Sequence, residues 1–256
     1  TEIYTLSLHD ALPICSNHVD TVDYGFDRRF YEEFICRIFS SVLSEPGNEH
    51  KLLGLSASLG YVNHIAGSCQ LENGTRTLRD SLTAALTANP DFIIMPEWNE
   101  LNENTCLAPG VLRSTNSKRI IRYFSGKARG DLSPLPGDRI DIPNLIVSSR
   151  AVMKGGDAYF LEVLNVPDTS ESRKYTVSCT LKDENGSIVK SFPPHVFDAS
   201  KLEEYRFTLT PRELAQMKSV KPELEIETTS GKKFAITRGL PAGRFQNTWK
   251  DRKSVV

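Results

Sequence analysis

The spacing of hydrophobic residues changes along the chain. In the first half, apolar residues recur at i, i+3 and i+4 in segments that alternate with short runs of consecutive apolar residues. The first pattern is typical of amphipathic helices, and the second is typical of strands buried on both faces. From Ile142 onward the period becomes two, as in strands with one buried face. The sequence therefore predicts an α/β region followed by an all-β region.

The α/β region is predicted to alternate helices and strands. Helices are expected over residues 28–44, 76–88 and 117–126, and buried strands over 51–59 and 92–95, with a polar loop over 62–75. The buried side of the first helix is expected to consist of Phe30, Phe34, Ile35, Ile38, Phe39 and Val42. Such alternation calls for parallel strands joined by helical crossovers.

The all-β region is predicted to contain short antiparallel strands. They are expected over residues 144–149, 157–164, 175–182, 188–192, 205–210, 223–228 and 233–237. Asn185-Gly186 and Ser230-Gly231 separate two pairs of these strands and supply the positive φ angles that tight turns need. This number and spacing of strands favours a sandwich of the immunoglobulin or fibronectin-III type.

The apolar run at Phe92–Met95 is followed by a cluster of acidic residues around a tryptophan. Glu97, Glu100 and Glu103 follow the predicted strand closely. Loops at the carboxyl ends of parallel strands converge on a common pocket. Two carboxyl groups in one pocket can cleave a glycosidic bond, one as the acid and the other as the base or nucleophile. The alternative is that these glutamates are solvated loop charges or charges at a helix N-terminus.

The same segment resembles a known glycosidase motif. Residues 99–105, Asn-Glu-Leu-Asn-Glu-Asn-Thr, are similar to the Asn-Glu-Trp-His-Glu-Gly-Thr motif at the last barrel strand of glycoside hydrolase family 99 and related barrels. Residues 58–61, Ser-Leu-Gly-Tyr, resemble the Gly-Pro-Gly-Tyr turn after the seventh strand of that family, and residues 74–91 match the unit between the two strands. Leu101, Asn102 and Asn104 differ from the family's residues.

The resemblance implies roles for both glutamates that match the motif. Glu100 would act on the 2-hydroxyl group of the sugar to form an epoxide-like intermediate, and Glu103 would be the general acid and base at the glycosidic oxygen. Five further residues are candidates for substrate binding: Trp98, Asn99, Tyr61, His64 and Glu97. Trp98 would pack under a sugar ring or, alternatively, belong to the core. His64 would line the pocket or, alternatively, be a solvated loop residue.

The resemblance spans about Leu52 to Pro109 and implies a fold class. We expect residues 15–130 to be the C-terminal part of a (β/α)8 TIM-type barrel, its last strands and helices, and residues 142–250 to be an immunoglobulin/fibronectin-III-like sandwich after a linker over 131–141. Residues 1–14 and 251–256 resemble translated sequencing adapter and are set aside. Because a whole barrel needs about 250 residues, we expect a fragment that is inactive and poorly soluble by itself.

Composition narrows the range of partners. The formal net charge is −1, without a basic stripe, which argues against nucleic acid as a partner. The five cysteines lack the spacing of a zinc site or disulfide framework, and we expect buried or reduced thiols and no cofactor. No apolar run is long enough to span a bilayer, so a soluble chain is expected.

The expected function is cleavage of glycosidic bonds in a polysaccharide or glycan, with α-mannosides and α-glucosides as candidate substrates. A polysaccharide-degrading enzyme would be secreted or periplasmic. The alternative is a non-catalytic protein that binds carbohydrate or protein, in which the barrel is degenerate and the sandwich is an accessory domain.

Overall fold

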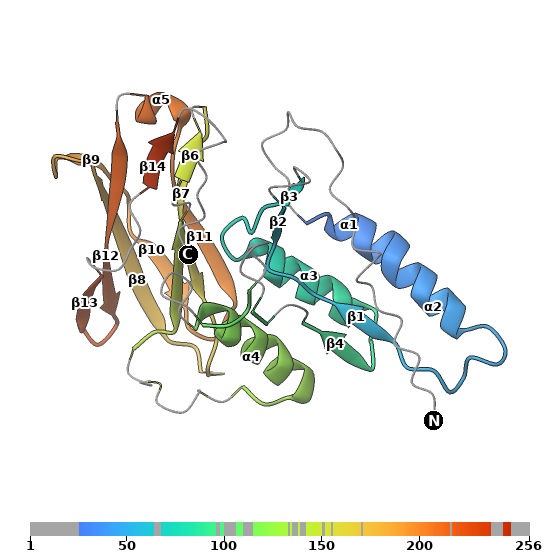
Figure 1. The fold of residues 1–256 in the computed structure, drawn as a ribbon. Coiled ribbons are helices and arrows are strands. Elements are labelled where there is room, and N and C mark those ends of the chain that lie inside the picture. Colours follow the sequence, from blue (N-terminus) through green and yellow to red (C-terminus); the bar gives the residue numbers. More distant parts are fainter. Residues whose placement is uncertain are drawn as a thin grey trace. The chain divides into compact units, whose positions relative to one another are not determined.

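The computed structural model describes residues 26–63, 68–95, 98–99, 106–109, 115–132, 134, 138, 142–149, 152–154, 156–169, 171–215, 217–236 and 243–246. Contacts divide the chain into two compact units, Thr1–Phe124 and Ser125–Val256. We call them the α/β unit and the β unit and describe each by itself (Figure 1).

The first helical segment of the α/β unit begins after Asp27, whose carboxylate accepts a hydrogen bond from the amide of Phe30 (2.9 Å). It consists of α1 (Arg28–Phe30), the π-helix η2 (Tyr31–Cys36) and α2 (Arg37–Leu43). A π-helix bonds i to i+5, so the side chains that share a face no longer follow the spacing of 3.6 residues. Its buried members are Tyr31 and Cys36, five positions apart.

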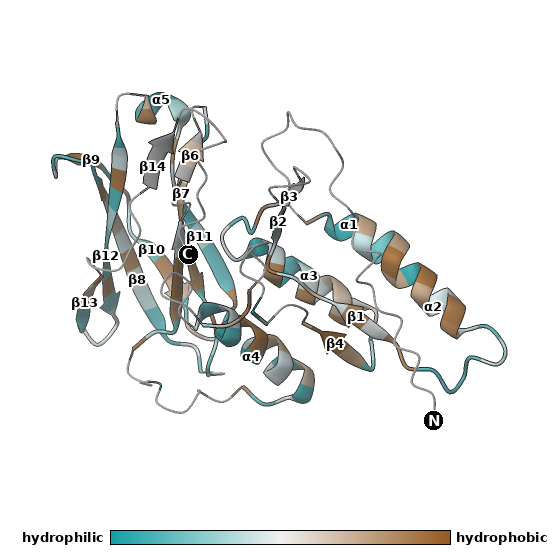
Figure 2. Cartoon of the chain, viewed as in Figure 1, coloured by the Kyte–Doolittle hydropathy of each residue, from teal (hydrophilic) through white to brown (hydrophobic). Residues whose placement is uncertain are grey.

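This geometry corrects part of the face predicted for that helix. Ile35 and Phe39 pack against the core as expected. Phe34, Ile38 and Val42 are instead exposed, by 54%, 56% and 36% of their surface. They recur at every fourth position and so form an exposed apolar stripe on this helix. Figure 2 shows hydrophobic residues (brown) along α2. Tyr31, outside the predicted face, is instead buried.

Two parallel strands lie at the centre of the α/β unit, as the alternation of elements predicted. β1 (Gly54–Ser56) pairs with β4 (Phe92–Ile94), and Gly54 lies opposite Phe92. α3 (Arg76–Thr87) connects them by way of β2 (Tyr61–Asn63) and β3 (Ser68–Gln70), and packs beside η2 (Figure 1). One face of the pair joins a core with these helices, made of Tyr31, Cys36, Leu53, Leu55, Ala84 and Ala85.

Three predictions for this unit need correction. The predicted strand over 92–95 is not buried on both faces, because Phe92 is 36% exposed and its neighbours are half-buried. Within the described residues only two strands make up this sheet. The segment expected to be a polar loop contains the antiparallel hairpin of β2 and β3. α4 (Asn116–Arg129) continues past the predicted end at Gly126.

The β unit consists mainly of strands. They are β5 (Leu145–Ser149), β6 (Val152–Lys154), β7 (Tyr159–Asn165), β8 (Lys174–Lys182), β9 (Ile188–Ser191), β10 (His195–Asp198), β11 (Glu203–Leu209), β12 (Ser219–Thr228), β13 (Lys233–Ile236) and β14 (Gly243–Gln246), with the short helix α5 (Pro211–Leu214) between β11 and β12. All seven predicted strands are present, and β6, β10 and β14 were not predicted.

These strands form two sheets around one hydrophobic core. Among the described residues, one sheet has the order β10-β8-β12-β14-β6, with β9 and β13 at its side, and the other has the order β11-β7-β5. β8 alternates as predicted, with Tyr175, Val177 and Cys179 buried. These side chains meet Leu161 and Val163 of β7 and Phe207 of β11 in the core. No helix in the described ranges is both long and apolar enough to cross a membrane.

Candidate functional site at the carboxyl edge of β1 and β4

The parallel pairing of β1 and β4 brings two chain segments to the same edge of the sheet. Beyond the last paired residues, the amide of Ala57 donates a hydrogen bond to the carbonyl oxygen of Ile94 (3.1 Å). The chain then runs from β1 to Tyr61 at the start of β2, and from β4 to Trp98. Ligands of α/β sheets bind at this edge, because the loops that leave the strands meet there.

The end of β1 is held by buried polar side chains. The hydroxyl of Tyr31 donates a hydrogen bond to the carbonyl oxygen of Ser56 (2.6 Å). Burial raises the pKa of this phenol far above its ordinary value, so the group stays a neutral donor. The amide of Ser58 donates to Oγ of Ser81 on α3 (3.2 Å). The segment after β1 is therefore fixed by both neighbouring helices.

After β4, the main chain of Trp98 is hydrogen-bonded to two residues that follow it in the chain. The amide of Ala108 donates a hydrogen bond to the carbonyl oxygen of Trp98 (2.8 Å). Sγ of Cys106 lies 3.3 Å from the same oxygen. We call Trp98, Cys106 and Ala108 the clasp. The stretch between its ends contains Glu100 and Glu103.

The side chains of the clasp differ sharply in exposure. The side chain of Trp98 is 64% exposed, and Asn99 beside it is also exposed. The alternative in which Trp98 belongs to the hydrophobic core is therefore wrong. The thiol of Cys106 is buried, with 7% of the residue exposed. An exposed indole on a fixed main chain can stack on a planar or ring-shaped ligand without a large loss of conformational entropy.

The other predicted site residues fall into two groups. Tyr61 begins β2 and is half-buried, and it follows β1 at the same edge as the clasp. Glu97, Glu100, Glu103 and His64 lie outside the described residues, so their roles remain predictions. No group of three or more His, Cys, Asp and Glu side chains within the described ranges is arranged to hold a metal ion.

Three residues that support this edge were not found from the sequence. Tyr31, Ser81 and Cys106 act through carbonyl oxygens and amides of the main chain. No pattern of side-chain types marks such contacts. Their common property, a buried polar group in a mostly apolar setting, becomes visible only in the folded chain.

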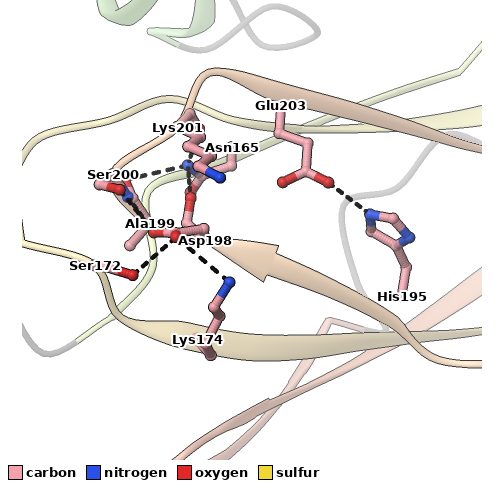
Figure 3. Close-up of polar contacts among 9 residues, drawn as sticks. All are labelled: Asn165, Ser172, Lys174, His195, Asp198, Ala199, Ser200, Lys201 and Glu203. Atoms are coloured by element: carbon pink, nitrogen blue, oxygen red, sulfur yellow. Dashed lines mark hydrogen bonds and ion pairs between the residues drawn. The ribbon is translucent and has the colours of Figure 1, made fainter.

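The β unit contains a second polar cluster (Figure 3). Asn165 at the end of β7 is buried, and its amide nitrogen donates to the carbonyl oxygens of Asp198, Ala199 and Lys201 at 2.6–3.2 Å. Its amide oxygen accepts a hydrogen bond from the Tyr175 hydroxyl (2.7 Å). These contacts join the end of β7 to β8 and to the turn after β10.

The carboxylate of Asp198 organises the same turn. It accepts hydrogen bonds from the hydroxyls of Ser200 (2.7 Å) and Ser172 (2.8 Å), and Nζ of Lys174 lies 3.5 Å away. The hydrogen bonds from Ser200, then those from Ser172, lower the pKa of this carboxyl far below its ordinary value. Because the cluster satisfies its polar groups internally, we assign it to the stability of the β unit.

Comparisons with known proteins give only distant resemblances. No protein-family model matches the chain, and no curated protein does. Among solved structures, a β-glucosidase from Listeria innocua in complex with glucose superposes with a TM-score of 0.26 at 14% identity, over 43% of this chain and 19% of that one. β-Glucuronidase 2 from Bacteroides uniformis superposes with a TM-score of 0.23 at 15% identity, over 36% of this chain and 12% of that one.

These neighbours are glycoside hydrolases, and the similarity to them is weak and partial. The chain spans less than a fifth of the length of either protein. Superpositions of this quality do not establish a common fold.

Proposed function

We propose that the chain is part of a glycosidase whose catalytic groups are Glu100 and Glu103. The observation that carries the proposal is the parallel pairing of β1 and β4, which brings the chain after β1, with Tyr61, and the chain after β4, with Trp98, to the same edge of the sheet. The clasp joins the ends of the segment with both glutamates, and the exposed indole of Trp98 offers a surface on which a sugar ring can stack. The substrate is a polysaccharide or glycan.

The reaction follows from the roles that the motif assigns. In the first step Glu100 takes the proton of the 2-hydroxyl group as its oxygen attacks the anomeric carbon, and Glu103 protonates the departing glycosidic oxygen. In the second step Glu103 takes a proton from water, which attacks the anomeric carbon, and Glu100 returns the proton to the 2-oxygen. Each carboxyl group thus ends in its initial protonation state.

In the architecture that accompanies this function, β1 and β4 are the last two strands of a (β/α)8 barrel. The exposure of Phe92 supports it, because the face opposite the helices would line the barrel interior. The exposed stripe of Phe34, Ile38 and Val42 supports it as well, because further helices would cover it. The two sheets of the β unit are proposed as an accessory sandwich of immunoglobulin or fibronectin-III type.

The proposal is tested by substitution in the full-length gene product that contains this sequence. Glu100→Gln and Glu103→Gln keep the side-chain shape and remove the carboxyl group. Each is expected to lower the release of reducing sugar from α-mannan or α-glucan at least about 100-fold, while binding of the same glycan is retained. Glu45→Gln, an exposed glutamate after α2, is the control and should match the wild type.

The results separate the enzyme from the non-catalytic alternative. Full activity in both glutamine variants would exclude these residues as the catalytic pair. Binding of glycan by the wild type without release of reducing sugar would indicate a carbohydrate-binding protein instead.

A further inference from the structure

The carbonyl oxygen of Trp98 lies within hydrogen-bonding distance of two donors that follow the glutamate segment. The amide of Ala108 is 2.8 Å away and the thiol of Cys106 is 3.3 Å away. A carbonyl oxygen has two lone pairs and can accept both hydrogen bonds. The carbonyl oxygen of Trp98 is thus hydrogen-bonded to both Cys106 and Ala108.

Burial of the Cys106 thiol affects how strongly its hydrogen bond holds the Trp98 carbonyl. Cys106 is 7% exposed, and a hydrogen bond shielded from water is stronger than one at the surface. A thiol is a weak donor, so its effect on overall stability is small. Its effect on position is larger, because it restrains the carbonyl of a residue that is 64% exposed and therefore little held by packing.

We propose that Cys106 is a positioning residue that acts through the Trp98 carbonyl. Together with Ala108 it fixes the main chain of the residue that presents the indole to the ligand. The inference rests on the proposed function. It adds that stacking of the substrate on Trp98 depends on the Cys106 contact.

The physical basis is preorganisation. A residue on a mobile main chain must lose conformational entropy when it orders against a ligand, whereas a residue on a fixed main chain has already lost part of it. Binding and catalytic groups must also lie within a fraction of an ångström of their productive positions. A misplacement of about 1 Å lowers the rate about 100-fold. Loss of the thiol donor leaves the Ala108 bond in place, so a smaller effect, about tenfold, is expected.

The first test uses the 256-residue chain and a spectroscopic readout. Trp249→Phe leaves Trp98 as the sole tryptophan of the chain. In this background, Cys106→Ala is expected to lower the fluorescence anisotropy of the indole and to raise its quenching by acrylamide about twofold, because removal of the donor loosens the Trp98 main chain. Cys106→Ser retains a donor and should restore most of the wild-type signal.

Cys36→Ala is the matched control, because Cys36 is also a buried thiol of the α/β unit and its Sγ contacts the carbonyl of Ala84 (3.9 Å). This variant should leave the Trp98 signal unchanged. If Cys106→Ala fails to fold, the unsubstituted chain still gives an answer. Its Ala108 amide should be protected from hydrogen exchange, and iodoacetamide should label Cys106 much more slowly than a peptide thiol. Fast exchange of that amide or fast labelling of that thiol would contradict a closed clasp.

The second test measures turnover by the full-length gene product on α-mannan and α-glucan. Cys106→Ala is expected to lower kcat/KM about tenfold, and Cys106→Ser to recover most of the loss. Equal kcat/KM values in all three proteins, with unchanged Trp98 anisotropy, would overturn the positioning role.

This outcome is distinguishable from failure of the proposed function. If Glu100→Gln and Glu103→Gln keep full activity while Cys106→Ala changes the Trp98 signal, the clasp stands and the catalytic assignment is wrong. If both glutamine variants are inactive while Cys106→Ala matches the wild type in every readout, the catalytic assignment stands and the clasp has no positioning role.

Discussion

The hydroxyl of Tyr31 donates a hydrogen bond to the carbonyl oxygen of Ser56 over 2.6 Å and thus ties a helix to the last residue of β1. Both residues are buried, at 1% and 6% exposure. The contact spans a large sequence separation and lies directly beneath the edge where the candidate site is built. A buried carbonyl that loses its donor costs more than the bond itself contributes.

Tyr31→Phe removes this hydrogen bond and keeps the ring in the core. We expect the free energy of unfolding of the α/β unit to fall by about 1–2 kcal/mol. Pulse labelling of Cys36 along a urea gradient measures it, since this thiol is buried in that unit. Labelling of Cys179, buried in the β unit, provides an internal control and should not change. An unchanged Cys36 midpoint would mean that water replaces the phenol at no cost.

Asn165→Asp tests the polar cluster of the β unit. The substitution keeps the shape of the side chain but places a carboxylate oxygen against three carbonyl oxygens. We expect the β unit to lose about 3 kcal/mol or more, read from the Cys179 labelling midpoint. Asn185→Asp makes the same chemical change in an exposed turn and should be nearly neutral. Similar midpoints for both variants would show that the buried amide does not hold the sheets together.

The lowered pKa of Glu213 predicts that the stability of the β unit depends on pH. The ion pair with Lys190 (2.7 Å) and the bonds of the capping box with Thr210 lower the pKa of this carboxyl to about 2. A pKa that is lower in the folded than in the unfolded chain stabilises the fold above the unfolded value, and this contribution disappears as the pH falls toward the folded value.

The β unit should therefore lose stability between about pH 5 and about pH 2, and Glu213→Gln should make this part of the loss shallower. Urea midpoints of the β unit, followed by circular dichroism at several pH values, measure the difference. Glu171→Gln, at an exposed surface pair with Arg173, is the control and should change the profile little. Parallel profiles for the wild type and Glu213→Gln would contradict the assignment.

The apolar stripe of Phe34, Ile38 and Val42 predicts poor solubility of the isolated chain. Exposed side chains on one helix face favour association and add little to the stability of the fold. Phe34→Lys and Ile38→Lys, singly and together, should raise the concentration at which the chain stays monomeric in light scattering, without lowering the Cys36 labelling midpoint. Leu82→Lys, at a position with 3% exposure in α3, should instead unfold the α/β unit.

Much of the α/β unit follows from local pattern, and its exceptions have physical causes. The helix stop at Asn89-Pro90 and the apolar run after it predict α3 and β4, and both are present. The face of the first helix was misjudged because a π-helix changes the angular position of every later side chain. The exposure of Phe92 depends on how many strands the sheet contains, which no local pattern encodes.

In the β unit, the turn residues are the best predictors of where strands begin and end. Asn185-Gly186 falls between β8 and β9 as predicted, with Gly186 at a φ of 84°. Two errors in the strand predictions involve proline, which lacks the N–H group that donates hydrogen bonds between strands. β12 begins before Pro222 rather than after it, and β10 follows Pro193-Pro194 directly. Strands as short as β6 and β14 carry too few residues to show a period.

The candidate site also contains some residues that the sequence predicts and others that only the folded structure reveals. Trp98 and Tyr61 belong to side-chain types that suit sugar binding, so the sequence alone proposes them as candidates. The residues that hold them in place, such as Ser81 and Cys106, contact main-chain atoms brought together by the fold. Such supports depend on tertiary contacts and not on residue type.

The hydrogen bond between Trp98 and Ala108 also indicates which residues at this edge of the sheet can be substituted. When the two ends of a segment are bonded to each other, residues between them can be replaced, added or removed without displacing the strand before it or the chain after it. The positions between Trp98 and Cys106 other than Glu100 and Glu103 are therefore the natural ones to vary in a designed library. A variant that keeps Trp98, the two glutamates, Cys106 and Ala108 can alter ligand preference while the scaffold keeps its stability.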